Sequence, residues 1–218
     1  MTGCPLRHFK HCWSATFEQL RQSPIMGTFD QKRFLNEHIP YRIHCLEACF
    51  HALRIIIADP PATSVKIKFD MGYEMVGPLA LVTNGWIEHG LITCRVMHNF
   101  LTGNKGKRRK DDITIDQFVK NNGESLPLVK IEDIADFRPE YLSRDFVIKA
   151  IDFTLLHASK TVAHITDAEI AEGQDVECIQ AACLTLITAI HVNLYDALGL
   201  QKPIPLVQES KRNERSLS

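Results

Sequence analysis

The sequence predicts an all-α protein that folds as a single-domain helical bundle of about five to seven helices. Three observations predict this class: apolar residues recur every three or four positions along most of the chain, short polar stretches separate these segments, and strand patterns are nearly absent. The chain has 218 residues, 45% of them apolar, and a formal net charge of −1. A chain of this length can bury a core without disulfides or a structural metal, and its charge gives no overall attraction to nucleic acid or anionic lipid.

The helical period divides the chain into segments. Helices are expected over residues 6–22, 30–38, 40–58, 78–101, 140–165 and 176–198. Pro40 should bend the chain between the second and third helices, and Gly199 should end the last one. Residues 65–69 alternate as a strand does, but without a partner strand we expect them to be extended or to lead into a helix. The expected domain covers residues 1–207, with N-terminal helices in 6–58, the bundle core in 78–198, and a flexible tail in 208–218.

The helix expected over residues 78–101 has two distinct faces. Its broad apolar arc, typical of a central helix, comprises Val82, Trp86, Thr93, Cys94, Val96, Met97, Phe100 and Leu101. The opposite polar stripe comprises Asn84, Glu88, Arg95, Asn99 and Thr102. This stripe is either the water-facing side of the helix or, if neighbouring helices enclose it, a site with acid, base and amide groups. His98 lies on the border of the two faces, close enough to Arg95 for both side chains to meet one substrate group.

A second group of reactive side chains falls on the helix expected over residues 140–165. His157, Lys160 and His164 share one face of this helix, at positions i, i+3 and i+7. Imidazole transfers protons near neutral pH, and an ammonium group holds an anion as a point charge. This face therefore suits proton transfer or phosphate binding, and the alternative is a partly buried polar seam.

Three stretches carry a family resemblance. Residues 85–101 read GWIEHGLITCRVMHNFL, residues 111–113 read DDI, and residues 159–166 read SKTVAHIT. Over residues 78–198 this pattern resembles a family of uncharacterised bacterial all-helical proteins. More distantly it resembles the HEPN superfamily of helical bundles, which often act as RNA-cutting toxins and share a motif of an Arg, a polar residue, three variable residues and a His. Lys160 and His164 match that motif, and Ser159 stands where its Arg belongs.

The HEPN resemblance implies metal-independent cleavage of RNA. In that mechanism His164 would be the general acid or base, and Arg95 or Lys160 would stabilise charge on the scissile phosphate. Arg95 would then replace the missing motif Arg from a neighbouring helix. The candidate catalytic residues are Arg95, His164, Lys160, Glu88, His98 and Asn99.

Other polar and sulfur-containing groups point to no cofactor or metal. The basic run in residues 105–110 holds five positive charges and suits phosphate contact, or it is a solvated loop partly neutralised by the following Asp111 and Asp112. Most of the seven cysteines fall in apolar helical runs, so we expect reduced thiols in a cytoplasmic protein. Cys45 and Cys49, with His44 nearby, lack the paired spacing of zinc sites, so no metal is expected. No apolar stretch approaches the roughly 18 residues of a membrane span.

Two functions of different classes follow from these observations. The first is a HEPN-like protein that binds or cleaves RNA, which a cleft joining Glu88, Arg95 and His164 would favour. The second is a non-catalytic protein-interaction or dimerisation module, which the missing motif Arg favours. Under the second function we expect a homo-oligomer, because small helical bundles commonly complete their cores by pairing.

Overall fold

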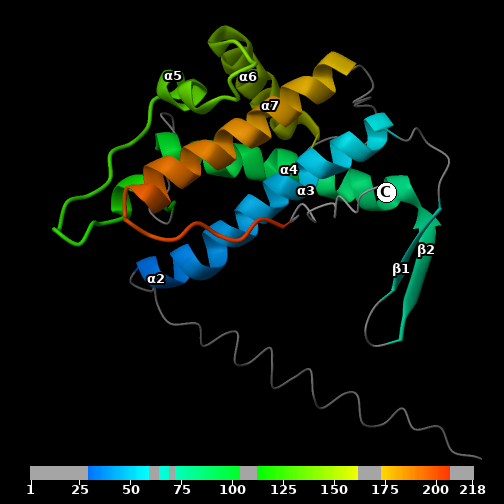
Figure 1. Ribbon diagram of the computed structural model, residues 1–218, viewed down its shortest axis with the longest axis horizontal. Helices are drawn as coiled ribbons and strands as arrows, with labels where there is room; N and C mark the ends of the chain where they lie inside the picture. The colour runs from blue at the N-terminus through cyan, green and yellow to red at the C-terminus, as the bar shows by residue number, and fades with distance from the viewer. Residues whose placement is uncertain (1–28, 59–63, 69–71, 104–111, 162–172, 207–218) are drawn as a thin grey trace, which may run out of the picture.

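The computed structural model describes residues 29–58, 64–68, 72–103, 112–161 and 173–206 (Figure 1). The helix expected over residues 6–22, the basic run in residues 105–110, His164 and the tail in residues 208–218 lie outside the described residues. The described part is mainly α-helical, which confirms the predicted class in its coarse form. It also contains one two-stranded sheet, so a strictly all-α description is wrong.

Four long helices make up most of the described chain: α3 (Ile39–Ala58), α4 (Leu79–Thr102), α6 (Arg144–Thr161) and α7 (Gly173–Ile190). They correspond to four of the helices expected from the apolar period. The shorter helical elements are α2 (Gln31–Arg33), α5 (Ile131–Ile134), 3-10 turns at Ile115–Gln117 and Ala135–Phe137, and π-helical segments at Phe34–His38 and His191–Asp196.

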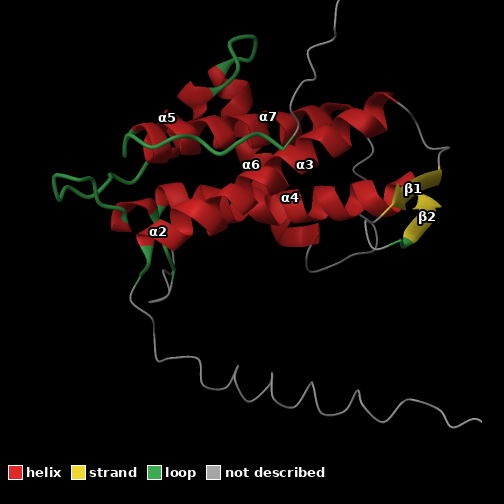
Figure 2. Ribbon diagram, turned by 60° about the horizontal axis from the view of Figure 1, so that its bottom comes forward, coloured by secondary structure: helices red, strands yellow, loops and turns green. Residues whose placement is uncertain are grey.

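One hydrophobic core joins the four long helices. α3 packs along α4, α7 packs against both, and α6 packs on α4 and α7 (Figures 1 and 2). Fully buried side chains come from every one of these helices, among them Leu46, Leu53, Leu91, Met97, Ile151, Ile179 and Leu186. Each such side chain contributes about 1.5–3 kcal/mol when it leaves water. The core therefore includes α3 and extends beyond residues 78–198, where the sequence analysis placed it.

Helices α3 and α4 approach each other closely at Gly90. A Cβ atom built on Gly90 would lie 2.2 Å from the Cβ and 2.6 Å from the Sγ of Cys49 in α3. Real carbon atoms keep about 3.5–4.0 Å apart, so only glycine fits this position without a shift of α3. The close approach also decides which face of α4 is buried.

The buried face of α4 overlaps the predicted apolar arc only in part. Thr93, Cys94, Met97, Phe100 and Leu101 are buried as predicted, and Gly90 and Leu91 are buried as well. Of the other arc residues, Trp86 and Val96 are exposed and Val82 is half-buried. The observed and predicted faces differ because α3 packs over Gly90, and a glycine has no apolar side chain that would mark this side of the helix as buried.

The predicted single extended stretch is one strand of a β-hairpin. β1 (Ser64–Lys68) pairs antiparallel with β2 (Glu74–Pro78), with Val65 opposite Gly77 and Ile67 opposite Met75. The expectation of an unpartnered strand was wrong because β2 contains a glycine and a proline and lacks regular alternation. The hairpin projects from the bundle at the start of α4 (Figure 1).

Helix ends follow local capping chemistry. α6 begins at Arg144 and not at Glu140, because the Ser143 hydroxyl accepts the Phe146 N–H at 3.2 Å and Leu142 closes a turn on the Pro139 carbonyl. Gly199, with φ of +67°, follows the last helical residues as predicted. The apolar segment Asp175–Asp196 is long and hydrophobic enough to cross a membrane by composition, but 61% of its most apolar 18-residue stretch is buried inside the molecule, as in a core helix.

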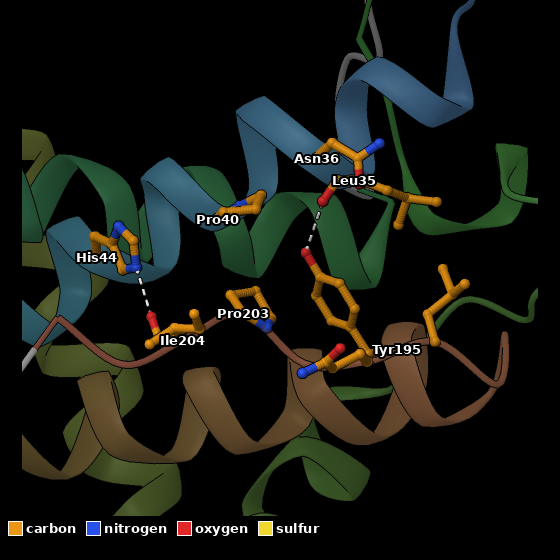
Figure 3. A pocket seen from close by; sticks show the side chains of 9 residues that line it. Leu35, Asn36, Pro40, His44, Tyr195, Pro203 and Ile204 are labelled. Carbon is orange, nitrogen blue, oxygen red and sulfur yellow. Dashed lines mark hydrogen bonds between the residues drawn. The ribbon is translucent and has the colours of Figure 1, made fainter. Parts of the chain in front are cut away.

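Pro40 does not simply bend the chain, because it imposes a π-helical segment before α3. The Ile39 N–H bonds to the Phe34 carbonyl five residues back, and Pro40 has no N–H to offer Leu35 or Asn36. The Leu35 carbonyl is instead bonded by the hydroxyl of Tyr195, at 3.1 Å, from the second π-helical segment (Figure 3). The carbonyl that Pro40 leaves without an amide partner thus connects the π-helical segment before α3 to the π-helical segment after α7.

Candidate functional site

The predicted polar stripe of α4 faces outward. Asn84, Glu88 and Arg95 are exposed, while Asn99 and Thr102 are half-buried. Neither Glu88 nor Arg95 takes part in an ion pair within the part of the chain that the structure describes. The stripe is therefore displayed on the surface of the bundle, and no described helix encloses it as a catalytic cleft.

Three apolar side chains share this exposed side of α4 with the two charged ones. We define the outer face of α4 as Leu81, Glu88, Ile92, Arg95 and Val96, all exposed. At 100° per residue they fall within an arc of about 100°. Leu81 is 73% exposed, and Ile92 and Val96 are each 39% exposed. Three large apolar groups in one such arc are more than a purely solvated helix face requires.

The hairpin that leads into α4 also exposes apolar side chains. Tyr73, Met75 and Val76 on β2 and its turn are 70%, 50% and 65% exposed. Val65 and Ile67 on β1 and Gly77 on β2 are half-buried, and the other strand residues are exposed, so neither face of the sheet is fully buried in the core. Lys66 and Lys68 of β1 each pair with Glu74 of β2, which holds the two strands together from the polar side.

His98 lies apart from Arg95. Its ring is half-buried between α4 and α6, and neither ring nitrogen has a hydrogen-bond partner among the described residues. Burial lowers the pKa of His98, while the neighbouring Asn99 and the Asp152 carboxylate of α6 act in the opposite direction. Burial therefore favours the neutral form of the half-buried His98 imidazole, whereas the Arg95 side chain is exposed on the surface of the bundle.

The histidine group on α6 is only partly described. The Nδ1 atom of His157 lies 3.0 Å from the Phe153 carbonyl, and its ring packs on the Phe153 ring with 4.0 Å between centroids. Ser159, at the motif Arg position, donates its hydroxyl to the Leu155 carbonyl of its own helix. Lys160 belongs to the last turn of α6, and its side chain, like all of His164, lies outside the described residues. The convergence of Arg95 with His164 thus stays a prediction.

Three buried thiols meet where α3, α4 and α7 pack together. The Sγ atoms of Cys94 and Cys183 are 3.7 Å apart, and Cys49 adjoins Cys183. Contact with Cys183, together with burial, raises the pKa of Cys49 well above its usual value. The described cysteines are free thiols, as expected. No group of three or more His, Cys, Asp and Glu side chains within the described ranges is placed to hold a metal ion.

A cavity of about 470 Å³ lies between the start of α3 and the segment after Gly199 (Figure 3). His44 Nε2 lies 2.9 Å from the Ile204 carbonyl, and the Glu47 carboxylate accepts the Leu206 N–H at 2.8 Å, so residues 200–206 lie along α3. The volume suits a small molecule. Its Tyr195 hydroxyl and His44 nitrogen, however, already bond within the protein, which leaves a mainly apolar wall. Sequence reasoning missed this cavity because residues 200–206 carry no helical or strand pattern.

Comparison with known proteins gives no relative: no family model, no curated protein and no solved structure matches the chain.

Proposed function

We propose that this protein is a non-catalytic helical module that associates with itself through the outer face of α4 and the adjoining hairpin. The observation that carries this proposal is the set of large apolar side chains exposed on the outer face of α4, Leu81, Ile92 and Val96, together with exposed apolar side chains on the hairpin that leads into α4. Exposed apolar patches of this kind are typical of protein interaction sites.

The hairpin also lacks a full packing partner. A two-stranded hairpin is marginally stable in water unless one of its faces packs against something else. In this protein one face of the hairpin is exposed and the other, with Val65, Ile67 and Gly77, is only half-buried, and the hairpin touches the bundle mainly through its junction with α4. A partner surface would provide the packing that the bundle itself does not provide.

The alternative function is enzymatic cleavage of RNA, which stays a prediction. It requires Arg95 and His164 to act on one phosphate, and the exposure of Arg95 and the separate burial of His98 offer it no support within the described residues. On our proposal, purified protein leaves RNA intact in EDTA. Cleavage that is lost in His164→Ala would establish the HEPN-like function instead.

The test of self-association is sedimentation velocity over protein concentrations from about 1 to about 200 μM, the range for a small and transient interface. We expect the weight-average sedimentation coefficient of the wild type to rise with concentration. The double variant Leu81→Ser, Ile92→Ser should stay monomeric with an unchanged circular dichroism spectrum, since both side chains are exposed. Tyr141→Ser is the matched control, because Tyr141 is 80% exposed in the turn before α6 and lies outside the proposed surface. A wild type that is monomeric throughout this range would overturn the proposal.

A further inference from the structure

We infer that two copies of this chain pair through α4 in antiparallel orientation, with Glu88 of each copy facing Arg95 of the other. This inference rests on the proposed self-association and names its partner and its geometry. Two opposite charges on one exposed helix face set this geometry.

Glu88 and Arg95 are placed to bind a second helix and not each other. They are seven residues apart, which is about two turns and roughly 10 Å along the helix axis. At 100° per residue their directions differ by only about 20°, so both lie on the same flank of the outer face. Both side chains are exposed and form no ion pair within the described part of the chain.

The order of these charges selects the direction of pairing. A two-fold axis that passes midway between residues 88 and 95 reverses the second helix and brings each Glu88 opposite an Arg95, on the same side of the interface. Such an interface is isologous and holds two identical ion pairs. A parallel two-fold pair would instead put the charged flanks of the two helices on opposite sides of the interface, with like charges at the same height, so neither ion pair would form.

The apolar residues of the outer face fit the same arrangement. Ile92 lies next to the midpoint between residues 88 and 95, so the two Ile92 side chains would meet at the two-fold axis, between the ion pairs. One helix face from each copy is a small interface, and we therefore expect a concentration-dependent dimer. Exposed ion pairs add little affinity, so their main effect here is to fix direction.

Charge reversal tests the orientation. Glu88→Arg sets two guanidinium groups face to face, and Arg95→Glu does the same with two carboxylates. We expect each single variant to raise the dimer dissociation constant by about tenfold, since two pairs are reversed in each dimer. The double variant Glu88→Arg, Arg95→Glu restores both pairs with inverted polarity and should return close to the wild-type constant. In a parallel dimer residues 88 and 95 would not face each other, so the second charge reversal would not restore a loss caused by the first.

Cross-linking gives a second readout that does not depend on affinity. Ile92→Cys should form a disulfide-linked dimer under mild oxidation, because its two copies meet at the axis. Leu81→Cys should not, because residues 81 of the two copies would lie roughly 30 Å apart along the axis. The wild type, treated identically, controls for the native cysteines.

The possible failures of the two proposals are distinguishable. A wild type that never dimerises refutes the proposed function. A wild type that dimerises while both single charge variants keep the wild-type constant, or while Leu81→Cys cross-links and Ile92→Cys does not, refutes the antiparallel pairing and leaves self-association standing.

Discussion

Replacing Gly90 by alanine should destabilise the bundle, although alanine is the better helix former. The added Cβ would lie 2.2 Å from Cys49 Cβ, 2.6 Å from Cys49 Sγ and 3.4 Å from the Cys45 carbonyl oxygen. Carbon atoms need about 3.5 Å, so α3 and α4 must separate locally by roughly 1.3 Å. Cys49 Cβ is attached to the backbone of α3 and cannot rotate out of the way.

The magnitude follows from two opposing terms. Alanine in place of glycine inside a helix stabilises it by about 1 kcal/mol. Overpacking a core typically costs about 1–3 kcal/mol and occasionally more, and a clash with fixed backbone-attached atoms belongs at or above the top of that range. The net expectation is a loss of about 2 kcal/mol, which corresponds to a fall in Tm of about 4–8 °C for a domain of this size.

Urea denaturation followed by circular dichroism measures this loss directly. The matched control is Gly85→Ala in the same helix, where a Cβ meets nothing within 4 Å. That variant should be as stable as the wild type or up to about 1 kcal/mol more stable. If Gly90→Ala gains stability as Gly85→Ala does, then α3 and α4 do not approach this closely, and the account of their packing is refuted.

Three further predictions concern titration and reactivity. Burial lowers the pKa of both His98 and His191 from 6.5, so the unfolded chain takes up protons at a higher pH than the folded protein does. The free energy of unfolding should therefore fall as the pH drops below about 6.5. Urea midpoints at several pH values measure this dependence, and His98→Gln should weaken it. Burial raises the pKa of Tyr195 from 10 to about 12, so the free energy of unfolding should fall between pH 10 and 12, and Tyr195→Phe should reduce that fall. At neutral pH the same variant should lower the free energy of unfolding by about 1–2 kcal/mol, because the Leu35 carbonyl loses its hydrogen bond. Cys183, which is fully buried and has a pKa raised well above 9.0, should resist iodoacetamide in the native protein and react after unfolding, and peptide mapping that finds it alkylated in native protein would contradict its burial.

The four long helices could be predicted from the sequence because each buries a regularly spaced apolar stripe. The hairpin could not, because Glu74–Pro78 lacks alternation and gains its partner only when the chain turns back on Ser64–Lys68. The orientation of α4 was predicted only in part. Trp86 and Val96 look like core residues in the pattern, but the approach of α3 over Gly90 turns them outward.

The candidate site shows the same division. The position of Glu88 and Arg95 opposite the apolar arc follows from local sequence, but whether neighbouring helices enclose them did not, and the structure leaves both exposed. The burial of the His98 ring could not be predicted from local sequence, because it depends on α6, which lies about 50 residues later in the chain. Likewise, no local pattern links Tyr195 to the carbonyl that Pro40 leaves without an amide partner.

Residues 200–206 cover one side of α3, and during synthesis of the chain this side can be covered only late. The contacts of residues 200–206 with His44 and Glu47 span 160 and 159 residues of sequence. At about 5–20 residues per second, a ribosome needs roughly 8–30 s to extend the chain over that distance. During this interval a nascent chain keeps the imidazole of His44 and the carboxylate of Glu47 in water, so the wall of the cavity closes only after the helices beneath it have been synthesised.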